Sequence, residues 1–125
     1  MIVELSIGEV IDRLTILEIK LARISKVELR RHVVVEHEKL LASFAASQRI
    51  EGIDAIRAEL KAVNESLWDI EDALREHEQR KDFGDLFVQL ARSVYRLNDR
   101  RSGIKRRINE VAGSSPSDIK SYTLY

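Results

Sequence analysis

The sequence predicts an all-α protein, an antiparallel helical bundle with a long hairpin at its C-terminal end. Charged residues make up 34% of the 125 positions, whereas there are only five glycines and one proline. This composition is typical of long amphipathic helices joined by few turns. Apolar residues also recur at alternating spacings of three and four, which is the rhythm of a helix that buries one face. Because the length is that of a typical domain, we expect one domain over residues 1–125.

The first two helices are expected over residues 7–24 and 26–47. Ser6 followed by Glu9 fits a capping box, with Ser6 as the N-cap of the first helix. Ser25 begins a second match, S-K-V-E, so we expect a break between the helices there; one continuous helix is the alternative. The second helix is less regular than the first, and its run of three valines lowers the helix propensity.

The third and fourth helices, residues 53–80 and 85–112, carry the clearest pattern. Each has eight successive positions of a coiled-coil-like seam, seven of them apolar and one polar: His77 in the third helix and Arg101 in the fourth. The turn at 81–85 is expected to cap the fourth helix with an aspartate. A short loop between long helices makes them antiparallel neighbours, here a hairpin of roughly 40 Å at about 1.5 Å per residue.

The two ends of the chain are the places where extended structure is expected. Residues 2–5 read as a strand-like lead-in, and Gly113, followed by Pro116, marks the end of the last helix. Residues 121–125 are rich in tyrosine and threonine and could extend to pair with 2–5. A disordered tail is the open alternative.

The composition excludes several classes of site. The chain has no cysteine, so disulfides, thiolate metal sites and thiol nucleophiles are ruled out. The N-terminus lacks the pattern of a signal peptide, and no apolar stretch approaches the roughly 20 residues that span a bilayer. We therefore expect a cytoplasmic protein without a membrane span. The 21 acidic residues balance the 21 basic ones, which argues against nucleic acid as a partner.

Two stripes of opposite charge run along the hairpin. Like charges four residues apart repel by about 0.2–0.5 kcal/mol per pair, so the basic stripe of the fourth helix needs compensation. An acidic stripe on the third helix, also on outward positions, suits a second copy or a neighbouring helix, and a solvated face is the alternative. Across the seam itself, Glu59 is expected to face Arg107. The basic stripe consists of Arg92, Arg96 and Arg100, and the acidic stripe of Glu65, Asp69, Asp72 and Glu76.

Arg101 differs from the other basic residues because it lies on the apolar seam. A guanidinium there must be paired or must reach solvent along its stem. Glu18, on the flank of the first helix, is the expected partner, and Glu65 is the next candidate. One interpretation is a buried ion pair that fixes the register of the helices. The other is a polar pocket between helices for a small anionic ligand, formed by Glu18, Asn98, Asp99, Arg101 and Lys105.

Aromatic and histidine side chains complete the candidate residues. Trp68 and Tyr95 are expected either to pack under the second helix or to form an exposed anchor patch with the basic stripe. His77, on the seam, is typical of a packing histidine. His32 and Glu36 have the spacing of two metal ligands, but no third ligand can be named, so we predict no metal and no cofactor. The sequence holds no motif that would name a catalytic residue.

Four stretches carry a resemblance that spans nearly the whole chain: SIGEVIDRLTILEIKLARI, SLWDIEDALREHE, ARSVYRLNDRRSGIKRRIN and IKSYTLY. Together they resemble a family of small bacterial domains of unknown function. Domains of this kind occur near genes for surface polysaccharide or lipopolysaccharide assembly, so the resemblance implies a cytoplasmic bacterial protein. It implies no activity and no catalytic residue.

These features favour a non-catalytic helical interaction module, an adaptor or assembly protein. The hairpin is longer than the first two helices, so its far part is expected to stay uncovered until a partner packs on it. We therefore predict a homodimer or a complex with another protein. The alternative is a small anionic-ligand-binding or metal-dependent enzyme domain that uses the polar residues around Arg101.

Overall fold

The computed structural model describes residues 2–45, 52–113 and 119–123. Four helices dominate them and confirm the predicted all-α bundle. The elements are, in order, β1 (Ile2–Leu5), α1 (Ile7–Arg23), α2 (Val27–Ala45), α3 (Ile53–Arg80), α4 (Asp85–Ala112) and β2 (Ile119–Thr123). Helices α1, α3 and α4 match the predicted bounds to within one residue. The end predicted for the second helix, residue 47, lies outside the described residues.

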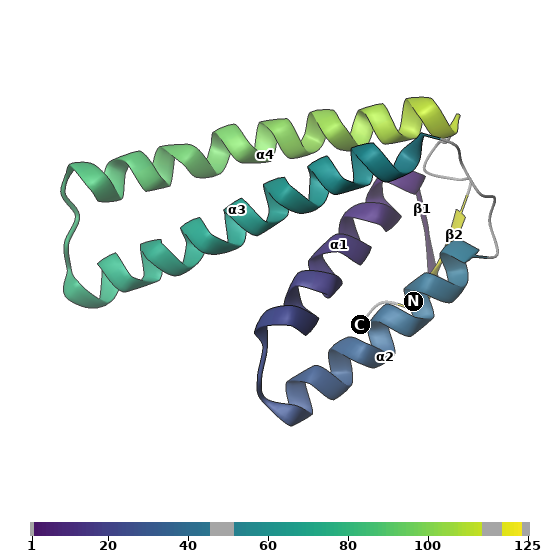
Figure 1. Ribbon diagram of the computed structural model, residues 1–125, viewed down its shortest axis with the longest axis horizontal. Coiled ribbons are helices and arrows are strands. Elements are labelled where there is room, and N and C mark those ends of the chain that lie inside the picture. Colours follow the sequence, from purple (N-terminus) through teal and green to yellow (C-terminus); the bar gives the residue numbers. More distant parts are fainter. Residues whose placement is uncertain (1, 46–51, 114–118, 124–125) are drawn as a thin grey trace.

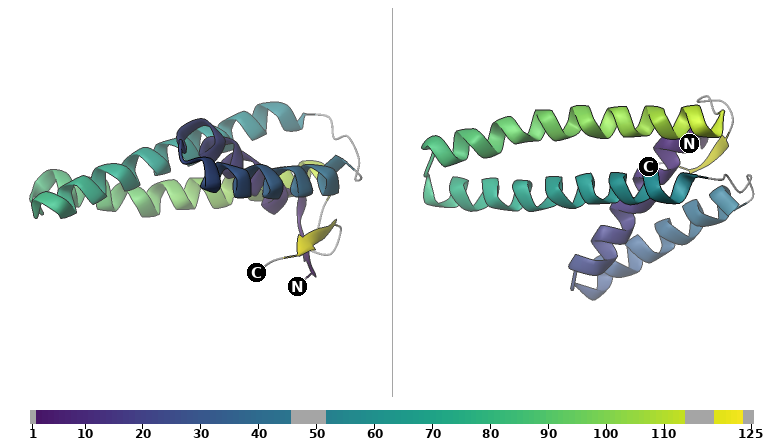
Figure 2. Two further views of the ribbon diagram at one scale, coloured as in Figure 1. Left: turned by 90° about the horizontal axis from the view of Figure 1, so that it is seen from below. Right: turned by 45° about the horizontal axis from the view of Figure 1, so that its top comes forward.

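Two helical hairpins make up the molecule. In Figure 1, α3 and α4 run side by side in opposite directions, and α1 and α2 form a shorter hairpin that branches from the end where α3 begins and α4 ends. Helix α1 packs against α2, α3 and α4, whereas α2 packs on α1 and on β2. Figure 2 shows that the part of the long hairpin around its turn extends beyond α1 and α2.

The start of α1 follows the predicted capping, and the break before α2 lies where it was predicted. The Ser6 hydroxyl accepts a hydrogen bond from the Glu9 backbone N–H at 3.2 Å, so Ser6 is the N-cap. Helix α1 ends at Arg23 and α2 begins at Val27, which confirms the break near Ser25. The guanidinium of Arg30 donates to the backbone carbonyls of Leu21 and Ile24 and so satisfies carbonyls that the end of α1 leaves free.

The strands β1 and β2 pair with each other in antiparallel fashion. Ile2 lies opposite Thr123 and Leu5 opposite Ile119, with an irregularity between Ile2 and Glu4. The pairing of the two ends is therefore confirmed, although it begins two residues earlier in the tail than predicted. Leu124 and Tyr125, which the prediction included, lie outside the described residues.

The turn between α3 and α4 corrects the predicted cap. Gly84, without a side chain, occupies the N-cap position of α4, and Asp82 instead accepts a hydrogen bond from the Gly84 backbone N–H at 3.3 Å. The aspartate prediction was wrong because Asp82 lies inside the turn and closes it from there. Lys81 takes the left-handed conformation that ends α3, with φ of 52°. His77 is confirmed as a packing histidine: it is buried, and its Nδ1 lies 3.0 Å from the carbonyl oxygen of Asp82.

The apolar core lies where the two hairpins meet. Its fully buried members come from all four helices and are Val10, Ile11, Leu14, Leu40, Leu60 and Ile108. From residue 70 to residue 96, a segment we call the distal half of the long hairpin, His77 alone is buried. The core therefore fixes α1 on one end of the long hairpin and leaves the other end as two helices without a cover among the described residues.

Candidate functional site

The N-terminal end of α1 lies directly on the backbone of α4. The backbone N–H of Gly8 donates to Oδ1 of Asn109 at 2.7 Å. A Cβ atom at Gly8 would lie 2.5 Å from the carbonyl oxygen of Lys105, closer than Cβ atoms can approach backbone. Only glycine therefore allows this crossing of the two helices. Sequence reasoning gave no role to Gly8 or Asn109, because the contact joins residues 101 positions apart.

Next to this crossing, the carboxylate of Asp12 receives the guanidinium of Arg101. Nε of Arg101 lies 2.9 Å from one carboxylate oxygen, and Nη2 donates to the other, so the pair is bidentate. Asp12 has no exposed surface. The hydrogen bond to Asp12 raises the pKa of Arg101 above its ordinary value. The ammonium of Lys105 lies 2.5 Å from a carboxylate oxygen of Glu9 and 3.8 Å from Asp12.

Two further side chains complete the hydrogen bonds around Asp12. Nδ2 of Asn64 donates to the Asp12 carboxylate and to Oγ1 of Thr15, both at 2.9 Å. The Thr15 hydroxyl in turn donates to the backbone carbonyl of Asp12 at 2.8 Å. We call these six residues the Asp12 cluster: Glu9, Asp12, Thr15, Asn64, Arg101 and Lys105. It ties α1 to both α3 and α4, and a buried network of this kind fixes how helices sit on one another.

The predicted partner of Arg101 was wrong. Glu18 binds Arg57 instead, with both carboxylate oxygens 3.1 Å from Nη2 of the guanidinium. The side chain at position 12 reaches Asn64 of α3 and Arg101 of α4, whereas the side chain at position 18 reaches only the beginning of α3, at Arg57. A signal for Asp12 was present in the sequence, because Asp12 shares one helix face with Gly8, Thr15 and Ile19, all of them buried. Apart from Ile19, the residues of that face are small or polar, so the spacing of apolar residues does not reveal it.

The structure brings together only part of the predicted ligand-binding group. Arg101 and Lys105 converge on α1, whereas Asn98 and Asp99 are exposed on α4 and Glu18 is engaged elsewhere. The expected cross-seam pair of Glu59 and Arg107 is confirmed, with two hydrogen bonds of 3.2 and 3.0 Å.

One interpretation placed Trp68 and Tyr95 under α2, and the structure places them elsewhere. Trp68 lines a pocket with Ile16 and Ile19 of α1, and Tyr95 is 52% exposed on α4. The guanidinium of Arg96 lies 5.9 Å from the centre of the Tyr95 ring. Hydrogen bonds from Arg92 and Arg96 lower the pKa of Tyr95.

The acidic stripe and the basic stripe differ in the contacts that their other residues make. In the acidic stripe, Asp69 receives a hydrogen bond from Arg23 of α1, and Asp72 pairs with Arg75 at 3.0 Å. The acidic stripe is thus partly matched within the chain, by α1 and by its own helix. In the basic stripe, Arg100 lines a shallow hollow of about 160 Å³ between α3 and α4.

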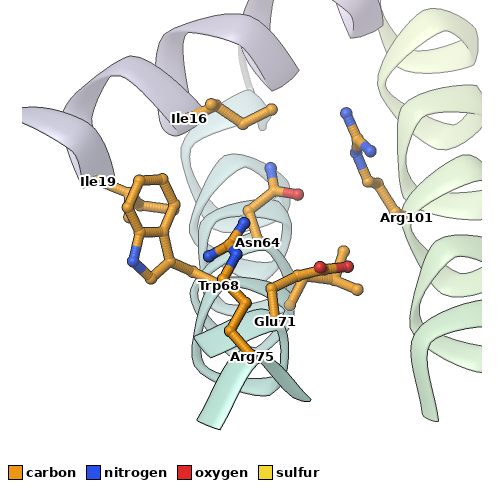
Figure 3. A pocket seen from close by; sticks show the side chains of 8 residues that line it. Ile16, Ile19, Asn64, Trp68, Glu71, Arg75 and Arg101 are labelled. Carbon is orange, nitrogen blue, oxygen red and sulfur yellow. The ribbon is translucent and has the colours of Figure 1, made fainter. Parts of the chain in front are cut away.

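A pocket of about 220 Å³ lies beside the Asp12 cluster, between α1, α3 and α4. Figure 3 shows Asn64, Trp68, Glu71 and Arg75 projecting from α3 and Arg101 from α4 on the opposite side. The remaining lining residues are Ile16, Ile19 and Leu67. The pocket therefore combines an apolar wall with polar groups, two of which, Asn64 and Arg101, belong to the Asp12 cluster.

The described residues show neither a cluster of metal ligands nor a membrane-spanning helix. Within residues 2–45, 52–113 and 119–123, no three carboxylate or histidine side chains gather as metal ligands would. No helix in this part of the chain is both long and apolar enough to cross a bilayer.

One family model matches the sequence. Its description is "Family of unknown function (DUF6165)", and the match covers residues 1–124. No match was found among curated proteins or among solved structures.

Proposed function

The chain belongs to the family of unknown function DUF6165, and we propose that it is a non-catalytic helical protein-interaction module. The distal half of the long hairpin carries this proposal. Phe83 and Leu86, near the turn, are 50% and 63% exposed, and Val88 and Tyr95 follow them along α4 with about half of their surface in solvent. Several large apolar side chains along one projecting element mark an interaction surface.

The Asp12 cluster supports a structural role for the polar residues around Arg101. Asp12 forms an ion pair with Arg101, and Glu9 forms one with Lys105. An anion bound there would have to compete with a buried carboxylate for the same guanidinium. The contacts of Arg101 therefore support an anionic-ligand site or a metal-dependent enzyme site less well than they support a structural role.

The occupant that we propose for the distal half is a second copy of the chain. In this segment the exposed charged side chains of α3 are mostly acidic, among them Asp72, Glu76 and Glu78, whereas α4 carries Arg92 and Arg96. Two distal halves packed with α3 of one copy against α4 of the other would bring opposite charges together and bury the apolar residues of both.

Light scattering at micromolar concentration tests this proposal. We expect the mass of a dimer for the unchanged chain and of a monomer for Leu86→Glu, because a charge in the contact is costly to desolvate. Val27→Glu is the matched control: Val27 is 68% exposed but lies on α2, away from the distal half, and this variant should remain a dimer. A monomer mass for the unchanged chain would remove the second copy as the occupant.

The setting of the module is a separate proposal. The resemblance of the four sequence stretches favours a cytoplasmic bacterial protein linked to surface-polysaccharide assembly. Affinity capture from the native host, with components of that assembly as the expected partners, tests this link. Capture of none of them would oppose it.

A further inference from the structure

The pocket between α1, α3 and α4 contains a buried polar atom whose partner is missing from the described part of the chain. Asn64 is 6% exposed and lines the pocket. Its amide nitrogen makes both hydrogen bonds of the side chain, to Asp12 and to Thr15. Its carbonyl oxygen, Oδ1, receives no hydrogen bond from any described residue. A buried acceptor without a donor is costly, at about 1–3 kcal/mol, so the structure calls for a donor at this point.

The orientation of the Asn64 amide is fixed by its neighbour. A carboxylate can only accept hydrogen bonds, so the group that faces Asp12 must be the NH2 of Asn64. The carbonyl oxygen is then turned away from Asp12. Figure 3 shows this oxygen on the side of Asn64 that faces α4 and Arg101.

Arg101 supplies the complementary donor. Its guanidinium has five N–H groups, and the Asp12 carboxylate receives hydrogen bonds from Nε and Nη2. The others are left for an occupant of the pocket, which Arg101 lines. Because Asp12 already neutralises the charge of Arg101, the pocket offers a hydrogen-bond donor there without a free positive charge.

The other residues that line the pocket favour a ligand with an apolar ring. Ile16, Ile19, Leu67 and the ring of Trp68 form the wall. A volume of about 220 Å³ is below the roughly 300–1,000 Å³ of pockets for drug-sized ligands, so it suits a single ring with one substituent. Arg75 is paired with Asp72, so Glu71 is the one lining residue whose charge has no ion-pair partner among the described residues. A free carboxylate at the rim disfavours an anion.

We propose that this pocket binds a small planar molecule in which an apolar ring carries a carboxamide. The N–H of the carboxamide donates to Oδ1 of Asn64, its carbonyl oxygen accepts from Arg101, and the ring lies against Trp68 and the two isoleucines. Of the lining residues only Glu71 and Arg75 belong to the distal half, and the proposal does not rest on the interaction module.

Benzamide is the probe that tests the proposal, and two molecules of the same shape are its controls. Benzoate offers acceptors alone and benzamidine donors alone, whereas benzamide offers one of each. Trp68 is the single tryptophan of the chain, so its fluorescence and its indole N–H signal in NMR report on this pocket. We expect benzamide to shift both signals saturably and to bind at least about tenfold tighter than either control, because benzoate leaves Oδ1 of Asn64 without a donor and benzamidine leaves Arg101 without an acceptor.

Two substitutions locate the binding. Ile16→Phe places a larger side chain in the pocket without touching the hydrogen bonds of the Asp12 cluster, and we expect it to abolish the response to benzamide. Val34→Phe, on the exposed face of α2, is the matched control and should leave the response unchanged. Asn64→Leu also removes the acceptor, but it breaks the Asp12 cluster, so Ile16→Phe is the decisive variant.

Three outcomes would overturn the proposal: no saturable change with benzamide, equal binding of benzoate or benzamidine, or an undiminished response in Ile16→Phe. The same titration with N-acetylglutamine methylamide distinguishes a free ring compound from the side chain of a partner protein. Tighter binding of benzamide than of this glutamine probe supports the ring compound, and the reverse order would contradict it.

Discussion

The two ends of the long hairpin share one sequence pattern and differ in burial. At the end covered by α1, Leu60 and Ile108 are fully buried, whereas in the distal half the seam residues Leu74, Leu90 and Val94 are only half-buried. A seam between two helices leaves each apolar residue open on one side until a third element covers it. The apolar spacing therefore predicts that two helices meet, and it does not predict whether anything lies on top of them.

The polar and charged side chains also differ between the two ends of the long hairpin. The buried polar network of the Asp12 cluster lies at the covered end, where α1 crosses α3 and α4. In the distal half the charged side chains lie in solvent, and this includes the short-range pair of Arg75 with Asp72. The covered end is thus held in one arrangement by buried polar contacts, whereas the exposed charged side chains of the distal half are free to meet a partner of the kind proposed above.

Loss of Asp12 should have the largest effect on the covered end. In Asp12→Ala, Arg101 would remain beside the core without its carboxylate, and Asn64 would lose an acceptor. Breaking a buried pair in this way costs about 3–5 kcal/mol of unfolding free energy, measured by urea denaturation. Asp99→Ala, at an exposed position of the same hairpin, should stay within about 0.5 kcal/mol. Equal losses for the two variants would contradict the structural role of the Asp12 cluster.

Leucine truncations measure the difference between the two ends directly. Leu60→Ala should cost about 2–5 kcal/mol, because the side chain is fully buried. Leu74→Ala, in the half-buried distal seam, should cost less than half as much at low protein concentration. The gap should narrow as the concentration rises, if a second copy covers the distal half. Equal costs for both variants in dilute solution would show that burial is even along the hairpin.

A glycine pair tests the close crossing of α1 and α4. Gly8→Ala should destabilise the fold by about 1–3 kcal/mol, because the new methyl group would meet the Lys105 carbonyl at 2.5 Å. Gly103→Ala is the control, since outside the neighbouring backbone of its own helix the nearest heavy atom to its Cβ would be in the side chain of Arg106, at 3.9 Å. In an exposed helix this change should be neutral or stabilising by up to about 1 kcal/mol. Thermal unfolding of both variants checks this order. A Gly103→Ala variant that is less stable than Gly8→Ala would contradict the close crossing.

The smallest effect is expected from the surface pair of Glu59 and Arg107, through its dependence on pH. The hydrogen bond from Arg107 lowers the pKa of Glu59 in the folded chain. A lowered pKa means that the stabilisation is complete above the ordinary pKa of glutamate and is lost as the pH falls through the folded pKa. The stability difference between the unchanged chain and Glu59→Gln should therefore be small at neutral pH and vanish in acid. A stability difference that grows toward low pH would contradict this prediction.

The helices were predictable from the sequence because their signals are local. Ser6 caps α1 through a residue three positions away, and the bounds of α3 and α4 follow from spacings of three and four. The Glu59–Arg107 pair was also predictable, since the antiparallel hairpin fixes which residues face each other across the seam.

The centre of the site was not predictable, because its contacts join distant parts of the chain. Asp12 meets Asn64 across 52 positions and Arg101 across 89. The angle at which α1 crosses the hairpin decides whether residue 12 or residue 18 reaches Arg101, and no local pattern encodes that angle. Sequence reasoning located the guanidinium that needed a partner and then chose the wrong carboxylate.

Amide hydrogen exchange at two protein concentrations tests most directly whether a second copy covers the distal half. We predict that the backbone amides of residues 70–96 become more protected as the concentration rises, while those of α1 keep the same protection. The Leu86→Glu variant should lose this dependence on concentration. Protection of residues 70–96 that is the same at both concentrations would contradict the account.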